Sequence, residues 1–196
     1  MKFKVFLLSV MCILLSVSGA FAQPDATVIV HQSTLNGFLN AIGPVSGKAD
    51  FKVAGAKGTY HWTVKNAKIN LMPDAAKFTA DAAIKVAGFK YNSTAKGEVI
   101  VKYNREANLI AVKVSKASFE VYTKIFGKKI HIADVDISKF YKPEFQFAGP
   151  QPVQDSVEVV MPDGSTKVIN ISMKDANMKL AEQKIVVTSN LEFTPQ

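Results

Sequence analysis

Apolar and polar residues alternate along most of the chain from Phe51 onward. Between Phe78 and Val86 every second residue is apolar, whereas Thr79, Asp81 and Lys85 between them are polar. A period of two is typical of a β-strand that buries one face. The same alternation returns at residues 99–103, 110–114, 157–161, 169–173 and 185–187. A chain with this pattern is expected to be mainly β, with each strand turning its apolar residues to a common core.

Turn-forming residues separate these segments at short spacing. Polar residues at 104–108 divide two alternating segments, and "LAEQK" divides two others. In "MPDGST", Pro162-Asp163-Gly164 fits a type I turn followed by a left-handed glycine. Successive hairpins predict a single long, curved antiparallel meander sheet.

One segment near the start has helical rather than strand periodicity. Ser33 is a candidate N-cap, Gly43 suits a left-handed C-cap, and Pro44 prevents continuation. The apolar positions of the segment share one helical face: Leu35, Phe38, Leu39 and Ile42. A helix this short is not stable alone. We therefore expect it to pack on the concave face of the sheet, in a mainly β (α+β) fold. A second, two-turn helix is expected at Asp136–Tyr141, capped by Asp136 and ended by Pro143.

The first 22 residues have the features of a signal peptide. Lys2 and Lys4 precede an apolar run too short to span a membrane, and Ala20-Phe21-Ala22 matches a signal peptidase site. We expect cleavage after Ala22, a single domain at residues 23–196, and export to the periplasm or the extracellular space. The one cysteine, Cys12, lies in this segment, so we expect no disulfide in the exported part.

Charge and motifs limit the function classes. Removing the signal peptide takes the formal charge from +8 to +6, and lysines spread along the chain supply it. Without an arginine cluster, nucleic acid is not an expected partner. The charge is compatible with an anionic membrane surface or lipid headgroup, and equally with a solvated lysine surface that keeps sheet edges from pairing. None of the three histidines has a second histidine or cysteine at metal-ligand spacing, and no nucleophile motif is present. We expect no enzyme activity, no metal and no cofactor.

Four segments together resemble a known family. They are "STLNGFL", "WTVKNAKINL", "AKFTADAAIKV" and "TAKGEVIVKYNREANLIAVKVSKASFEVY". Over Val28–Tyr122 their order is similar to that of the tubular lipid-binding (TULIP-like) bacterial envelope proteins. The resemblance implies a helix packed into a curled antiparallel sheet, with acyl chains held in the groove between them.

Candidate ligand-binding residues follow from this expected groove and from an aromatic-rich segment after Phe119. Small inward residues leave room in a groove, and ammonium groups beside aromatic side chains suit a phosphate headgroup. The groove candidates are Leu35, Phe38, Leu39, Ile42, Trp62, Ala82, Phe119, Tyr122, Ile125 and Phe126. The headgroup or surface candidates are Lys128 and Lys129.

Three functions fit the sequence. The first is an exported, soluble protein that binds or carries a lipid or another apolar ligand. The second is an apolar-ligand barrel of another kind, lipocalin-like or polyisoprenoid-binding. The third is an envelope structural or interaction module with a filled core. The first two functions require an interior cavity that is lined by aliphatic side chains and open to a ligand, whereas the third requires none.

Overall fold

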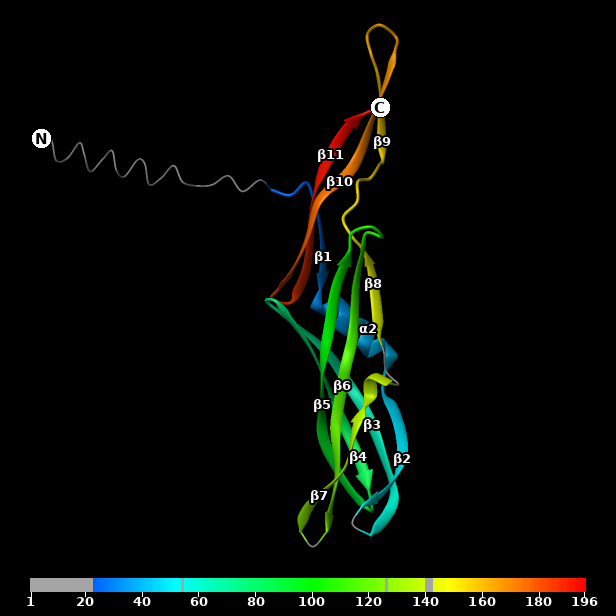
Figure 1. Cartoon of the computed structure of the whole chain (residues 1–196), viewed down its shortest axis with the longest axis vertical. Coiled ribbons are helices and arrows are strands. Elements are labelled where there is room, and N and C mark those ends of the chain that lie inside the picture. Colours follow the sequence, from blue (N-terminus) through cyan, green and yellow to red (C-terminus); the bar gives the residue numbers. More distant parts are fainter. Residues whose placement is uncertain (1–22, 54, 126, 140–142) are drawn as a thin grey trace, which may run out of the picture.

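A computed structural model describes residues 23–53, 55–125, 127–139 and 143–196, so the expected signal peptide lies outside the described residues. These described residues form an elongated molecule of two antiparallel sheets with one α-helix between them (Figure 1). In chain order the elements are β1 (Ala26–His31), α2 (Gln32–Ile42), β2 (Val45–Val53), β3 (Ala56–Met72), β4 (Ala75–Val86), β5 (Phe89–Asn104), β6 (Leu109–Ile125), β7 (Lys128–Asp136), η1 (Ile137–Lys139), β8 (Glu144–Ala148), β9 (Ser156–Val160), β10 (Thr166–Ala181) and β11 (Lys184–Pro195).

The large sheet contains seven strands and is the body of the molecule. Five hairpin connections run from β2 to β7 in sequence order. β6 is long enough to pair twice along the same edge, with β8 at residues 109–113 and with β7 at 118–125. β2 and β7, at the two ends of the strand order, approach each other, so the sheet curls toward a half-barrel.

The small sheet contains four strands in the order β1-β11-β10-β9. Its core end carries Ile185 and Val187, which are fully buried. Its far end is the projecting β9–β10 hairpin, drawn at the top of Figure 1. Here the expected burial is wrong, because Val157, Val159 and Met161 remain about 40% exposed (41%, 39% and 39%). In Figure 1 the β9–β10 hairpin extends beyond the large sheet, so the large sheet does not cover this part of the small sheet.

The helix α2 closes the half-barrel where one strand edge is bare. β2 pairs with β3 only as far as Val64, so residues 65–72 of β3 have no strand on that side. Two helix side chains take its place. The Ile69 N–H donates to Asn36 Oδ1 (2.7 Å), and the Leu71 N–H donates to Gln32 Oε1 (2.7 Å). Residues i and i+4 of a helix and i and i+2 of a strand have nearly the same spacing, about 6 Å, so the two rows match.

A ring of hydrogen bonds ties the helix to both sheets. Beyond the Leu71–Gln32 bond, the Gln32 backbone N–H donates to the Gln183 carbonyl (2.9 Å), and the Gln183 N–H donates to the Leu71 carbonyl (3.1 Å). Gln183 lies in the β10–β11 turn, with φ at 59°. Leu71 is fully buried, so an unmet amide there would be costly. The ring fixes where the small sheet joins the large one.

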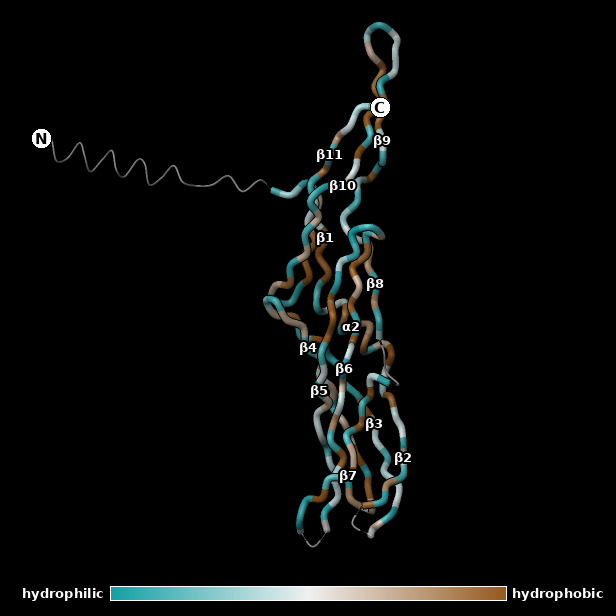
Figure 2. The backbone as a smooth tube through the Cα atoms, viewed as in Figure 1, coloured by the Kyte–Doolittle hydropathy of each residue, from teal (hydrophilic) through white to brown (hydrophobic). Residues whose placement is uncertain are grey.

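The core is continuous from the small sheet through the helix into the large sheet. Apolar and polar residues alternate along its strands (Figure 2), and the inward positions Phe78–Val86 are all buried, as the period of two predicts. Lower in the half-barrel, Trp62 on β3 meets Phe119 on β6, with ring centroids 5.9 Å apart. Gly47, opposite Trp62 on β2, makes room for the indole, since a Cβ there would overlap its ring. Aromatic side chains thus fill the interior at this level.

The structure confirms a mainly β, antiparallel fold with one helix, and it corrects several details. The expected single sheet is two sheets, because β1 and β9–β11 pair with one another and not with the meander. The helix begins at Gln32, and its N-cap is His31, two residues before the expected cap Ser33, since β1 runs up to His31. The two-turn helix expected at Asp136–Tyr141 is a single 3-10 turn, η1, within the described residues. Asp136 does cap it, accepting the Ser138 N–H (3.0 Å).

The strands β1 and β2 precede the segment where alternation becomes clear, and sequence reasoning missed both. In β2, the polar residues Ser46, Lys48, Asp50 and Lys52 share one face, but Gly47 and Ala49 weaken the apolar signal of the other face. No helix among the described residues is long and apolar enough to cross a membrane.

The buried row of the helix is the first point to test. Leu39 is 2% exposed in the core between α2 and β3. We expect Leu39→Asp to lower the free energy of unfolding by about 3 to 5 kcal/mol, because it places an unpaired carboxylate there. Denaturant unfolding measures this. An unchanged stability would mean that the helix does not pack as described.

The side-chain cap on β3 gives a second test. Asn36→Leu removes the acceptor of the Ile69 N–H and should cost about 1 to 3 kcal/mol, the penalty of a buried unmet donor. Asn40→Leu, one turn further along at an exposed position, is the matched control. Equal effects of the two substitutions on denaturant unfolding would contradict the cap.

Candidate functional site

Three hairpins end together at the end of the large sheet that lies away from the small sheet. They are the β2–β3, β4–β5 and β6–β7 hairpins, at the bottom of Figure 1. Near this end the sheet divides. β5 and β6 pair from Asn104 and Leu109 down to Lys96 and Ser118, and below that point each pairs only with its own hairpin partner. A cleft therefore opens between the β4–β5 and β6–β7 hairpins.

Two tyrosines bridge the cleft. Tyr91 of β5 and Tyr122 of β6 are in contact, with ring centroids 4.2 Å apart and ring planes tilted by 31°. The Tyr122 N–H donates to the Tyr91 hydroxyl oxygen (2.8 Å). This side-chain hydrogen bond replaces a backbone hydrogen bond to β5, which no longer pairs with β6 at this level. Burial raises the pKa of the Tyr91 hydroxyl above its ordinary value, so it is protonated at neutral pH. Side chains thus join the facing edges of β5 and β6 at the level where the two strands no longer pair with each other.

The cleft has a volume of about 200 Å³, and we name it the tip cleft. Its lining residues are Phe89, Lys90, Tyr91, Tyr122, Thr123 and Lys124. Phe89 is 51% exposed, which is high for a phenylalanine on a strand, whereas Thr123 is buried. The tip cleft therefore joins aromatic surface to two exposed ammonium groups.

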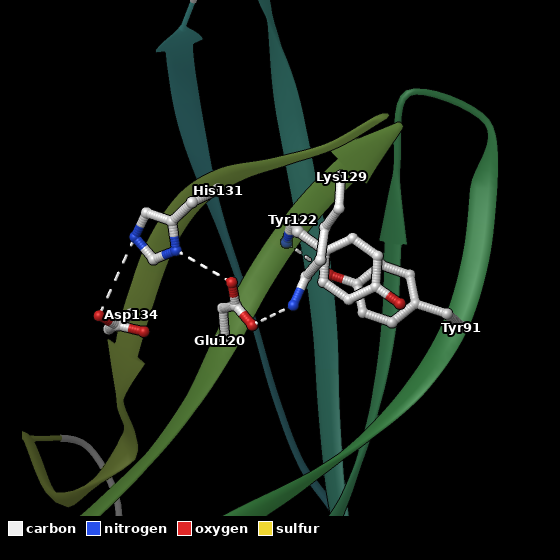
Figure 3. Close-up of polar contacts among 6 residues, drawn as sticks. All are labelled: Tyr91, Glu120, Tyr122, Lys129, His131 and Asp134. Atoms are coloured by element: carbon white, nitrogen blue, oxygen red, sulfur yellow. Dashed lines mark hydrogen bonds and ion pairs between the residues drawn. The ribbon is translucent and has the colours of Figure 1, made fainter. Parts of the chain in front are cut away.

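A row of charged side chains lies beside the tip cleft on β6 and β7 (Figure 3). The Lys129 ammonium forms an ion pair with one Glu120 oxygen and lies 4.3 Å from the centre of the Tyr122 ring. His131 Nδ1 is 3.2 Å from the other Glu120 oxygen, and its Nε2 is 3.9 Å from Asp134 Oδ2. Hydrogen bonds from Lys129 and His131 hold the pKa of Glu120 below its ordinary value of 4.5. Glu120 thus anchors Lys129 over the tyrosine.

The predicted groove residues separate into two groups. One belongs to the buried core, with exposures between 0% and 6%: Leu35, Leu39, Trp62, Ala82 and Phe119. The other is more exposed. Phe38 (48%) and Ile42 (49%) lie on the outer side of α2, where the Phe38 ring stacks on Phe145 of β8 at 5.3 Å.

The remaining predicted residues belong to the hairpin end of the large sheet. Tyr122 lines the tip cleft, and Lys128 and Lys129 are exposed at the start of β7. Ile125 ends β6, and Phe126 lies outside the described residues. Helix residues and tip residues therefore do not form one continuous groove lining.

Sequence reasoning missed Phe89, Tyr91 and Glu120. Tyr91 and Tyr122 are 31 residues apart, and only the divergence of two strands brings their rings together. Phe89 had a signal, since "KVAGFK" places a large apolar residue directly after a turn glycine. Glu120 is an outward residue of a regular strand and carries no local signal.

Other surface features offer less chemistry. A depression of about 440 Å³ on β3–β5 is bordered by outward polar side chains, including His61, Thr63 and Asn92. Among the described residues, no group of three or more His, Cys, Asp or Glu side chains is arranged to hold a metal ion.

Comparison with known proteins found no family model that matches the chain, and no significantly similar curated protein or solved structure. The site is therefore interpreted from its own geometry.

The Glu120 contacts predict a pH dependence. Its folded-state pKa is below 4.5, so its ionised form stabilises the fold at neutral pH, and this contribution is lost as the pH falls from 4.5 through the lowered pKa. We expect Glu120→Gln to be less stable than the parent at pH 7, with the two stabilities converging in acid. Denaturant unfolding across this range measures the difference. A constant difference down to the lowest pH would rule out the contribution.

Proposed function

We propose that the chain binds an anionic amphiphile, a lipid with a phosphate or carboxylate head, at the tip cleft. One observation carries the proposal: Phe89 and the contacting Tyr91 and Tyr122 rings share a cleft with Lys90 and Lys124. Aromatic rings favour contact with an apolar tail, and lysine ammonium groups favour an anionic head. The combination suits a ligand that has both parts.

The size of the cleft limits what it takes in. Pockets that enclose a drug-sized ligand usually have volumes of about 300 to 1,000 Å³. At about 200 Å³ the tip cleft holds part of a lipid, the head and the adjoining chain, and leaves the remainder outside. Partial enclosure of the lipid suits a soluble carrier that binds it reversibly better than a protein that encloses the whole lipid.

The proposal places the protein in the cell envelope or outside the cell, as a signal-peptide-bearing relative of the TULIP-like proteins without enzyme activity. The proposed export is supported by the signal-peptide features of residues 1–22. A ligand inside the half-barrel, as in a lipocalin-like or polyisoprenoid-binding fold, is supported less. Trp62 and Phe119 meet across that interior, and Ala82 is already fully buried.

A fluorescent long-chain fatty acid tests the proposal on the chain that begins at Gln23. We expect binding with a stoichiometry near one. Phe89→Ser should weaken it about fivefold, because roughly half of a phenylalanine's burial energy, about 1 kcal/mol, is lost. Phe193→Ser is the matched control, since Phe193 is 60% exposed on a strand of the other sheet.

The outcomes separate the candidate functions. A fatty acid that binds the parent and both variants equally would move the ligand away from the tip cleft. No binding at micromolar concentration would favour the third function, an envelope interaction module with a filled core. Native mass spectrometry of protein taken from its own compartment would identify a retained lipid by its mass.

A further inference from the structure

The three hairpins at the end of the large sheet share one short sequence. It reads "KVAGAK" at 52–57, "KVAGFK" at 85–90 and "KIFGKK" at 124–129. In each, the first lysine lies directly across the hairpin from the last: Lys52 opposite Lys57, Lys85 opposite Lys90, and Lys124 opposite Lys129. The same basic hairpin is therefore presented three times at one end of the molecule (Figure 1).

Turn geometry explains part of this repeat. Gly55, Gly88 and Gly127 have φ values of 79°, 83° and 76°, which glycine adopts without steric cost. In two of the tips the residue after the first lysine, Val53 or Val86, continues the alternation of its strand, and Val86 is fully buried. The lysines are not explained in this way, because like charges directly opposite each other in a hairpin are destabilising. An acidic residue at one position of each pair would keep the turn soluble and stabilise it.

The cations at this end are largely unpaired. Among the described residues, no carboxylate lies within ion-pair distance of Lys52, Lys57, Lys85, Lys90, Lys124 or Lys128. All six are exposed. Lys129 is held by Glu120, and the third hairpin carries the additional Lys128, so each tip offers two free ammonium groups. The three six-residue tips together contain seven lysines and no acidic residue.

The turns at the opposite end of the large sheet differ in charge. The β3–β4 turn contains Asp74, and the β5–β6 turn contains Glu106 next to Arg105, the only arginine of the chain. Positive charge is thus concentrated at one end of an elongated molecule. The half-exposed Phe89 lies at that same end, beside Lys90.

We propose that the three lysine-paired hairpin tips form a surface that docks the molecule, end-on, onto an anionic phospholipid bilayer. Three tips that end together can contact a plane at the same time, and each lysine near an anionic membrane contributes to attraction. Phe89 adds an apolar side chain at the depth where the headgroups meet the acyl chains. A nucleic acid fits less well, because its recognition favours arginine and the tips contain none. This inference does not depend on ligand binding in the tip cleft.

Vesicle co-sedimentation tests the inference on the chain that begins at Gln23. The vesicles contain phosphatidylcholine with about a third phosphatidylglycerol, in low salt. We expect the parent to bind, and binding to be lost in high salt or without the anionic lipid. Removing one pair, as in Lys52→Gln/Lys57→Gln, should weaken binding about thirtyfold, the product of two lysine contributions. The matched control, Lys96→Gln/Lys102→Gln, removes the same charge from exposed positions on the side of β5 and should weaken binding less than threefold.

Further measurements separate membrane docking from a loss of folding and from non-specific attraction between opposite charges. Because the pairs repel, the tip variant should melt no lower than the parent, so its loss of binding cannot come from unfolding. Equal weakening by the tip and control variants would overturn the inference, as would binding to double-stranded DNA as tight as to vesicles at the same salt. Phe89→Ser should weaken binding to vesicles, and an unchanged affinity would also contradict a bilayer partner.

The Lys52/Lys57 hairpin does not line the tip cleft, so its variant should bind the fluorescent fatty acid normally. Failure of vesicle binding with intact fatty-acid binding would reject membrane docking alone. The reverse result would reject the tip cleft alone.

Discussion

The hydrogen-bonded ring of Gln32, Leu71 and Gln183 is the point on which the architecture depends. It satisfies both backbone groups of a buried strand residue at the place where β3 has lost its strand partner. Since buried backbone groups are costly when unpaired, this part of β3 is stable only with the helix and the β10–β11 turn in position. The helix, the curl of the large sheet and the attachment of the small sheet follow from that requirement.

The same problem is solved in the same way at the other end of the molecule. β5 and β6 diverge, and the Tyr91 phenol takes the Tyr122 amide that a strand would otherwise have bonded. The divergence opens the tip cleft, and the two tyrosine rings become part of its surface. The tyrosines that cover this bare strand edge thus also form an aromatic surface beside exposed lysines.

The proposed activities belong to one end of the molecule because charge and fold divide it that way. The hairpin end carries paired lysines and no acidic residue in its tips, whereas the opposite turns of the large sheet contain acidic residues. The interior between the ends is closed by buried side chains, including the Trp62–Phe119 contact. The tips therefore offer apolar surface and cations together, as the proposed ligand and membrane require.

By itself, the sequence determined the helix α2, the hairpin turns and most of the strands, though not β1 and β2, because alternation, turn glycines and an apolar stripe act over a few neighbouring residues. The inward row Phe78–Val86 and the Gly164 turn (φ 85°) are as predicted. Only the tertiary structure decided that there are two sheets, that Phe38 stays half exposed, and that Tyr91 meets Tyr122. Each of these depends on which strand edges are left unpaired, and that is set by contacts between residues far apart in the chain.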